Sequence, residues 1–260
     1  MIASPATRPA QGPGRSISLP RMTMSKPEAS KLVAATYNIH YAIGTDRRFA
    51  PSRIAEVILS LAADVVALQE VGWHYRGRAG VDQFDILHEM TGFEVHAGLT
   101  RSHARANFGN AVLARAPARH VETLDLSVRF RAPRGALIVE LDTAPVPLRV
   151  VNVHLGLDPW ERTIQVKRLV KALAEAAPRP TLLLGDFNEW RRRPAYLAPL
   201  TRHFPTCAMP PSFHARRAAL SFDRIYLSEP LALEHARAVH SPSARRASDH
   251  LPVVATIGWG

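Results

Sequence analysis

The feature that most constrains the fold is an alternation of short β-rich runs with amphipathic helices, which continues from Lys31 to the end of the chain. Apolar residues recur at helical spacing over residues 51–64, and again after Asp158 and Pro159, which signal the start of a helix. Strand pairs joined by short turns are mixed with strand–helix–strand units, so we expect mixed sheets. One domain over residues 31–260 is the simplest interpretation.

Several of the predicted strands end in a polar residue that a hydrophobic core does not require. A single Asn, Asp or His at such a position is usually explained by turn capping or by a hydrogen bond to a backbone carbonyl. Carboxylate, amide and imidazole groups recurring together at strand ends are much harder to assign to capping, and converging strand ends provide rigid supports for a site. The residues are Asn38, Glu70, His154, Asp186, Asn188, Asp223, Asp249 and His250.

The chemical types of these side chains indicate a metal-assisted reaction. Carboxylate and amide oxygens without cysteine favour a hard cation, Mg²⁺ or Mn²⁺, which keeps some of its waters and binds substrate phosphate. Histidines beside such a cation are better suited to carrying protons or to donating to a phosphoryl oxygen than to ligation. The sequence therefore predicts metal-assisted hydrolysis of a phosphoester.

The charge of the chain suits a polyanionic partner. The formal net charge of +11 favours contact with nucleic acid, phosphoinositide or acidic lipid, although a general arginine bias explains scattered surface arginines more simply. Cys207 is the single cysteine, which excludes an internal disulfide and suits a reducing compartment.

The first thirty residues are expected to form a disordered tail, because they are rich in Pro and Gly and lack apolar periodicity. Their Arg-rich, acid-poor composition also resembles an organelle transit peptide, and a true start at Met22 or Met24 is a further alternative. Neither a secretory signal nor a membrane-spanning segment is expected. We therefore predict a cytoplasmic location.

Six short motifs, in the same order along the chain, resemble the sequence blocks of the endonuclease/exonuclease/phosphatase superfamily of Mg²⁺-dependent hydrolases. They are "TYNIH", "ALQE", "VNVHL", "LLGDFN", "FDRIY" and "SDHLPV", and the resemblance spans about residues 31–258. "GDFN" with a terminal "SDH" at this spacing is a specific signal, whereas any one block alone is weak. The superfamily includes DNase I-like nucleases, neutral sphingomyelinases and inositol-polyphosphate 5-phosphatases, and this chain is most similar to its compact bacterial-type members. The resemblance implies an α/β (α+β) fold, a four-layer sandwich of two packed mixed β-sheets flanked by helices.

The resemblance also implies roles in metal and water binding. Glu70 would be the principal Mg²⁺ (or Mn²⁺) ligand, with Asn38 holding metal or phosphate nearby and Asp249 completing the polar or second-metal site. Asp186 would orient and deprotonate the attacking water, and Asn188 would position that water or a phosphoryl oxygen. The number of metal ions is left open by this comparison.

Two histidines are assigned to the phosphate on the same grounds. His250, oriented by Asp223, would contact the scissile phosphate, and His154 would donate to the phosphoryl oxygens. Either an aspartate or a histidine could act as the general base in such a site, and we assign Asp186.

Three further residues are candidates for contacts with the substrate phosphate. Arg134 precedes a strand and would grip a non-bridging oxygen, although a surface ion pair explains it equally well. Asn110 would line the substrate cleft or serve a turn, and His40 would share a strand face with Asn38 by the two-residue period. Gly185, just before the "DFN" run, would allow a close approach of the backbone.

The substrate is predicted from the loops between the motifs. Residues 72–80 and 98–110 and the run "FHARRAAL" combine arginines with aromatic side chains, which suits nucleic acid; they contain Trp73, Tyr75, Arg76, Arg101, Arg105, Arg216 and Arg217. A phosphodiesterase acting on nucleic acid is therefore our first hypothesis. The second is a hydrolase of the same fold acting on a phospholipid such as sphingomyelin, on a phosphoinositide or on a small phosphoester. The third is a non-catalytic binding module. It conflicts with the presence of all the polar strand-end residues named above, because a protein without catalytic activity has no need for them.

Overall fold

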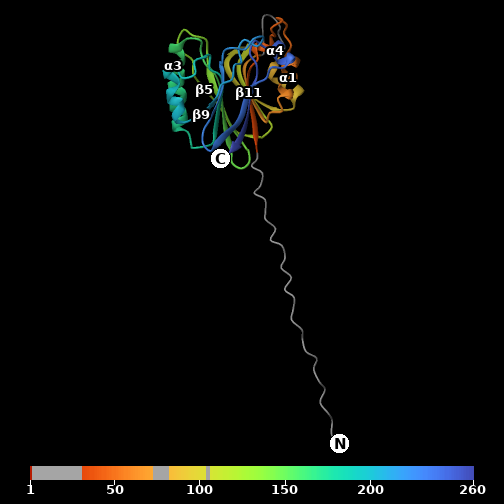
Figure 1. The fold of residues 1–260 in the computed structure, drawn as a ribbon. Helices are drawn as coiled ribbons and strands as arrows, with labels where there is room; N and C mark the ends of the chain where they lie inside the picture. Colours follow the sequence, from red (N-terminus) through yellow and green to blue (C-terminus); the bar gives the residue numbers. More distant parts are fainter. Residues whose placement is uncertain (2–30, 73–81, 104–105) are drawn as a thin grey trace.

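The computed structural model describes Met1 and residues 31–72, 82–103 and 106–260 (Figure 1). The predicted disordered tail therefore lies outside the described residues. So do several residues of the predicted substrate loops, namely Trp73, Tyr75, Arg76 and Arg105.

Two six-stranded sheets form the body of the protein. The first has the strand order β11-β12-β1-β2-β4-β3, with β1 (Leu32–Asn38), β2 (Val65–Gly72), β3 (Glu94–His103), β4 (Ala106–Ala114), β11 (Leu231–Ala238) and β12 (Val253–Trp259). The second has the order β5-β6-β7-β8-β10-β9, with β5 (Ala118–Asp125), β6 (Gly135–Leu141), β7 (Leu148–His154), β8 (Thr181–Asp186), β9 (Thr206–Ala208) and β10 (Asp223–Leu227).

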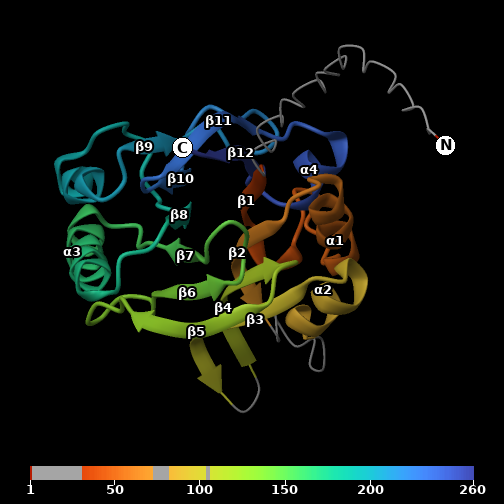
Figure 2. The same cartoon turned by 90° about the horizontal axis from the view of Figure 1, so that it is seen from below.

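The two sheets pack face to face and are covered by helices on their outer faces (Figure 2). One buried apolar cluster lies between the sheets, where residues such as Val112 of β4 and Leu137 of β6 meet. A second cluster lies under α1 (Pro51–Ser60), α2 (Gln83–Thr91) and α4 (Pro242–Ala247), and a third under α3 (Pro159–Glu175) and the 3-10 helix η2 (Ala195–Arg202). The four-layer sandwich predicted from the sequence is confirmed.

Each sheet is mixed in a way that brings polar strand ends to the same edge of the sandwich. The pairs β1/β2 and β7/β8 are parallel, so each pair ends at one edge. Strand β10 runs antiparallel to β8 and begins there, with Asp223 opposite Asp186. Strand β12 runs antiparallel to β1, so the loop before it, which carries His250, returns to the end of β1. All six motifs therefore meet at one edge.

A buried polar network joins the two sheets close to this edge. The amide of Asn152 in β7 donates to the carbonyl oxygens of Leu68 and Ala111, both at 2.8 Å, and so reaches two strands of the other sheet. Gln69 Nε2 donates in turn to Asn152 Oδ1 at 2.8 Å and to Thr36 Oγ1 at 3.1 Å. The "ALQE" and "VNVHL" motifs therefore contain structural residues beside the site residues.

Three strands were not predicted from the sequence. Strands β9 and β11 were not expected at all, and β3 covers part of the 98–110 stretch that we interpreted as a cleft loop, so Arg101 lies within a strand. All three are edge strands, β3 and β11 of the first sheet and β9 of the second. The conformation at Gly185 agrees with the close approach expected there: its φ is +147°, and a Cβ would lie 1.9 Å from the carbonyl oxygen of Val153 in the neighbouring strand.

Candidate active site

The polar strand ends surround a cleft of about 810 Å³. The residues predicted from the sequence that line it are Asn38, His40, Glu70, Arg134, His154, Asp186, Asn188, Asp249 and His250. Asp223 lies behind His250, which it contacts directly. Asn110 is the exception, and its position is described below.

Asp186 is buried and lies at the centre of the site. Its Oδ1 accepts a hydrogen bond from the backbone N–H of Asn188 at 2.8 Å, and its Oδ2 accepts one from Asn38 Nδ2 at 3.0 Å. The same Asn38 Nδ2 lies 3.3 Å from Glu70 Oε1. One amide therefore links two carboxylates that come from different sheets.

Glu70 reaches the cleft through a distortion of β2. Its φ is +60°, and the register of β2 against β4 shifts between Leu68 and Val71, which identifies a β-bulge. Positive φ is costly for a residue with a Cβ and persists where the surrounding structure enforces it. Burial raises the pKa of Glu70, and the nearby charges of Asp186 and Asp249 raise that pKa further.

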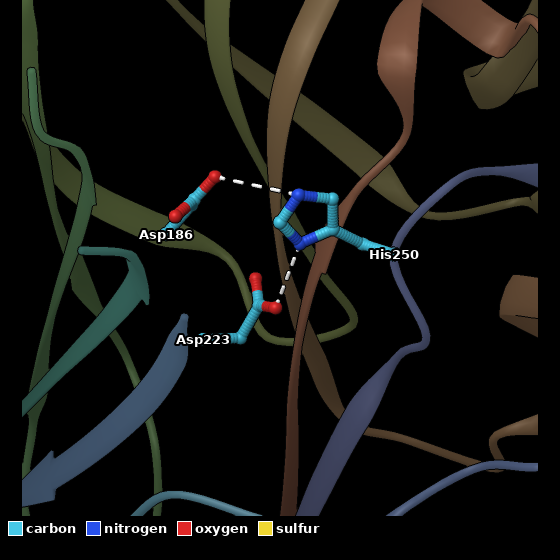
Figure 3. Close-up of side chains that lie close together, drawn as sticks. All are labelled: Asp186, Asp223 and His250. Carbon is cyan, nitrogen blue, oxygen red and sulfur yellow. Dashed lines mark hydrogen bonds and ion pairs between the residues drawn. The ribbon is translucent and has the colours of Figure 1, made fainter. Parts of the chain in front are cut away.

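His250 and Asp223 form a buried imidazole–carboxylate pair (Figure 3). His250 Nδ1 lies 2.9 Å from Asp223 Oδ2, which also accepts a hydrogen bond from Ser212 Oγ. Burial would lower the pKa of His250, but the charges of Asp223 and Asp186 outweigh it and raise that pKa to about 10. The imidazole is therefore positively charged at neutral pH, and its Nε2 faces Asp186 Oδ2 at 3.8 Å.

His154 is buried and, unlike His250, uncharged at neutral pH. Burial and the positive charge of Arg134 lower the pKa of His154 to about 3. Arg134 Nη1 lies 3.2 Å from His154 Nδ1, and because a guanidinium can only donate, Nδ1 must accept. The proton of the neutral ring then sits on Nε2, which lies 3.6 Å from Asp186 Oδ2 and 3.9 Å from Glu70 Oε1.

The arrangement of these groups suits a phosphate. Two imidazole N–H groups, one charged and one neutral, lie within 4 Å of the same oxygen of Asp186. Donors that converge in a largely buried cleft can stabilise negative charge on a phosphoryl oxygen, and the nearby carboxylate can accept a proton from water.

Two predicted residues take positions that differ from the expectation. His40 does line the cleft, but strand β1 ends at Asn38, and His40 lies in a tight 3-10 turn with φ of +47° rather than on the strand face. Asn110 is buried in β4, where its amide donates to the carbonyl oxygens of Gly135 at 3.1 Å and Asn152 at 3.4 Å. The structure therefore gives Asn110 a sheet-bridging position and not one in the cleft.

Sequence reasoning missed Glu189, which follows Asn188 directly and holds the loop after β8. Its side chain is 1% exposed, and its carboxylate accepts hydrogen bonds from Arg191 Nη2 at 2.8 Å and Tyr196 OH at 2.6 Å. Arg162 Nη2, from α3, adds an ion pair at 3.3 Å. A charged residue immediately after "GDFN" was the signal in the sequence, but its partners could not be read from it.

Arg224 also holds the loop that follows β8. Its guanidinium is fully buried in β10, and its Nη2 donates to the backbone carbonyl oxygens of Glu189 at 2.7 Å and Arg191 at 2.6 Å. The arginine of the "FDRIY" motif therefore fixes the backbone of the loop that begins at Asp186.

The donor set of the cleft fits a hard divalent cation. Glu70, Asp186 and Asp249 bring three carboxylates to one cleft, and a cation between them would stabilise their ionised forms. A second arrangement is offered by Asp186, Asp223 and His250, whose ligand atoms all lie within 4.8 Å of one another. The hydrogen bond between Asp223 and His250 Nδ1 occupies one side of that second group, which favours the set with Glu70. Asn38 meets Glu70 with its Nδ2 at 3.3 Å, while its Oδ1 accepts from the backbone N–H of His40 at 3.0 Å.

The described part of the chain contains no helix with both the length and the apolar character needed to cross a membrane.

The fold and the cleft define the DNase I-like class of sandwich, whose members are phosphoester hydrolases. The sequence profile of the Endonuclease/Exonuclease/phosphatase family matches residues 35–250, and the chain belongs to this family. Its curated relatives include the uncharacterized protein YbhP of Escherichia coli K12, which is 29% identical over 240 residues, covering 85% of this chain and 94% of YbhP.

Solved structures show the same fold at lower identity. An endonuclease/exonuclease/phosphatase of Beutenbergia cavernae is 22% identical with a TM-score of 0.75, over 88% of this chain and 72% of the other. D. rerio TDP2 complexed with a single-strand DNA product is 17% identical with a TM-score of 0.67, over 88% and 99%. A mannosyl-6-phosphatase of Bacteroides thetaiotaomicron is 16% identical with a TM-score of 0.70, over 88% and 100%.

Proposed function

We propose that this chain is a divalent-cation-dependent phosphodiesterase that acts on nucleic acid. The observation that carries the proposal is the convergence of two histidines, one charged and one neutral, on one oxygen of Asp186, with Nε2 distances of 3.6 Å for His154 and 3.8 Å for His250. A charged donor, a neutral donor and a proton acceptor within one cleft are the groups that hydrolysis of a phosphoester requires.

The chain's own residues divide the reaction between them. Asp186 orients the attacking water and takes its proton as the new P–O bond forms, and Asn188 holds the water or a phosphoryl oxygen. His250, kept charged by Asp223, and His154, with its proton on Nε2, donate hydrogen bonds to the phosphoryl oxygens. The bond to the leaving oxygen then breaks, and that oxygen takes up a proton from solvent. Arg134 acts on the phosphate through His154 in this arrangement.

Glu70 and Asn38 are the residues that would hold Mg²⁺ or Mn²⁺, with Asp249 at the edge of the same set. The cation would supply positive charge to the phosphoryl and leaving oxygens. Deformation of β2 at Glu70 supports this role, because a strained backbone that turns a carboxylate into a cleft is more easily explained by a ligand than by packing.

Nucleic acid is proposed as the substrate on two grounds. The chain is strongly basic, and exposed arginines flank the cleft at positions 191–193. The fold is shared with TDP2 in complex with single-strand DNA, although it is also shared with a mannosyl-6-phosphatase. A phosphodiester of nucleic acid therefore ranks above a sphingolipid, phosphoinositide or sugar phosphate.

A substrate screen tests the proposal. Purified protein with Mg²⁺ or Mn²⁺ is assayed on single-stranded and plasmid DNA, RNA, sphingomyelin vesicles, phosphoinositides and bis(p-nitrophenyl) phosphate. We expect metal-dependent cleavage of the nucleic acids, lost in Asp186→Asn. Asp142→Asn is the matched control, because Asp142 is exposed and follows β6 at the opposite end of the same sheet. If the protein hydrolysed only a lipid or a phosphomonoester, nucleic acid would not be its substrate.

A further inference from the structure

Large apolar side chains line the cleft where the loops after β7 and β8 meet it. Leu157 is 73% exposed and Trp190 is 58% exposed, yet both line the cleft together with the catalytic groups. Leu157 follows His154 by three residues, and Trp190 follows Asn188 by two. Exposed apolar groups beside a catalytic centre are a stronger indication of ligand binding than isolated exposed residues elsewhere.

A second pair of aromatic rings lines the cleft beside His250. The ring centroids of Phe213 and His250 are 5.0 Å apart, and those of Phe222 and His250 are 6.2 Å apart. The two phenylalanine rings lie 5.0 Å from each other and are both half-buried. Apolar surface therefore adjoins the catalytic groups at two different places, one near His250 and one near Asn188.

The loops that carry these apolar groups are strongly basic. The segments 126–134, 156–160, 187–194 and 209–222 contain eight arginines and two acidic residues. Both acidic residues are paired with arginines of the same loops: Asp158 lies 3.3 Å from Arg131, and Glu189 lies 2.8 Å from Arg191. The surplus positive charge suits a chain of phosphates that extends beyond the scissile one.

We infer that the cleft binds single-stranded nucleic acid. The base on one side of the scissile phosphate stacks on Trp190, and the base on the other side stacks on Phe222 and Phe213. This inference rests on the proposed function and names the substrate form within it. Aromatic stacking is sequence-tolerant because every base has a π-face. It also requires unpaired bases, since the bases of a duplex already stack on one another.

The positions of the rings favour this substrate over a lipid surface. Side chains that dock on a bilayer lie together on an outer face of the protein. Here Trp190, Leu157, Phe213 and Phe222 line the same cleft as the buried Asp186, so they would contact the groups on either side of the phosphate.

The test compares two substrates that differ only in their bases. One is a short single-stranded oligodeoxynucleotide, and the other is an abasic oligomer of the same length with the same phosphates. For wild-type protein in Mn²⁺, we expect kcat/KM to be at least about tenfold higher for the first, because both bases beside the scissile phosphate would stack and a tenfold preference corresponds to only about 1.4 kcal/mol. Each of two variants weakens the stacking of one base: Trp190→Ala should lower this ratio, and Phe222→Leu, which removes a ring but keeps an apolar group, should lower it as well.

Trp160→Ala is the matched control. Trp160 is 59% exposed, almost the same as Trp190, but it does not line the cleft, so the ratio should stay at the wild-type value. Duplex DNA of the same sequence should be cleaved more slowly than the single strand.

Equal metal-dependent cleavage of the normal and abasic oligomers by wild-type protein would overturn the stacking inference while leaving the phosphodiesterase intact. A Trp190→Ala variant that keeps the wild-type ratio but no longer binds phosphatidylserine vesicles would overturn it in favour of a lipid surface. Cleavage of neither oligomer would overturn both this inference and the proposed function.

Discussion

Replacing Glu189 with Gln removes the charge that holds the loop after β8, while keeping the size of the side chain. Glu189 is buried, and its carboxylate is contacted by Arg162, Arg191 and Tyr196 at distances of 3.3, 2.8 and 2.6 Å. The amide that replaces it can accept from some of these donors, but it cannot neutralise the buried Arg162. We therefore expect the variant to be less stable.

Two features of the site give the size of the effect. Removing one partner of a buried ion pair costs about 3 to 5 kcal/mol, because the other charge is left uncompensated. Hydrogen bonds from Arg191 and Tyr196 outweigh the effect of burial and lower the pKa of Glu189 to about 2. Relative to the ordinary value of 4.5, at about 1.36 kcal/mol for each pKa unit, this corresponds to roughly 3 kcal/mol. Both routes predict a loss of about 3 kcal/mol at pH 7.

The pH dependence provides a sharper test than the value at neutral pH. A carboxyl whose pKa is lowered by folding contributes stability above its unfolded pKa, and that stability is lost as the pH falls toward the folded pKa. The difference in unfolding free energy between wild type and Glu189→Gln should therefore be full at pH 7 and shrink between about pH 5 and pH 2. Urea denaturation followed by far-UV circular dichroism at several pH values measures it.

Glu122→Gln serves as the control, since Glu122 is exposed and faces His120 on the surface. It should change the unfolding free energy by less than about 0.5 kcal/mol and leave the rate of hydrolysis unchanged. A Glu189→Gln variant as stable as wild type at pH 7, or a difference that persists unchanged at pH 3, would refute the role given to this charge.

Three further changes have defined outcomes. Asp223→Asn should lower kcat about 100-fold with the fold retained, because His250 loses the carboxylate at 2.9 Å that keeps it charged; steady-state kinetics beside circular dichroism measure this. Asn152→Ala leaves two buried carbonyl oxygens of the other sheet without their donor and should cost about 3 kcal/mol in urea denaturation, so a loss under 1 kcal/mol would contradict the bridging role. Gly185→Ala places a Cβ 1.9 Å from a carbonyl oxygen of β7, and the midpoint of thermal unfolding should fall by about 10 °C; an unchanged midpoint would show that the strand pair can relax.

Sequence reasoning succeeded where the pattern was local. The strands that end in polar residues are central and buried on both faces, so their apolar runs are unbroken and their ends are easily seen. The missed strands β3, β9 and β11 are edge strands. Strand β9 has only three residues, and in β11 the alternation of buried and exposed residues is weak, so its charged positions resemble those of a loop. Edge strands are therefore harder to recognise from their sequence pattern than central strands, although the edge strand β5 was predicted.

Long-range contacts account for the remaining differences at the site. The strand period did not apply to His40, because β1 ends at Asn38 and the chain turns with positive φ over the next residues. The sequence context of Asn110 suggested a position in the cleft. Its hydrogen-bond partners, however, lie on the other sheet, 25 and 42 residues away in the sequence. The pairing of Glu189 with Arg162 likewise depends on the docking of α3.

The central claim is that Asp186 and a divalent cation in this cleft hydrolyse a nucleic-acid phosphodiester. It is tested most directly by the rate at which the purified protein cleaves an end-labelled single-stranded oligonucleotide in Mg²⁺, before and after EDTA, beside Asp186→Asn and Asp142→Asn. We predict that EDTA abolishes cleavage, that added Mg²⁺ restores it, and that Asp186→Asn is slower by about 100-fold or more while Asp142→Asn matches wild type. Cleavage that resists EDTA, or an Asp186→Asn variant with near-normal turnover, would contradict the claim.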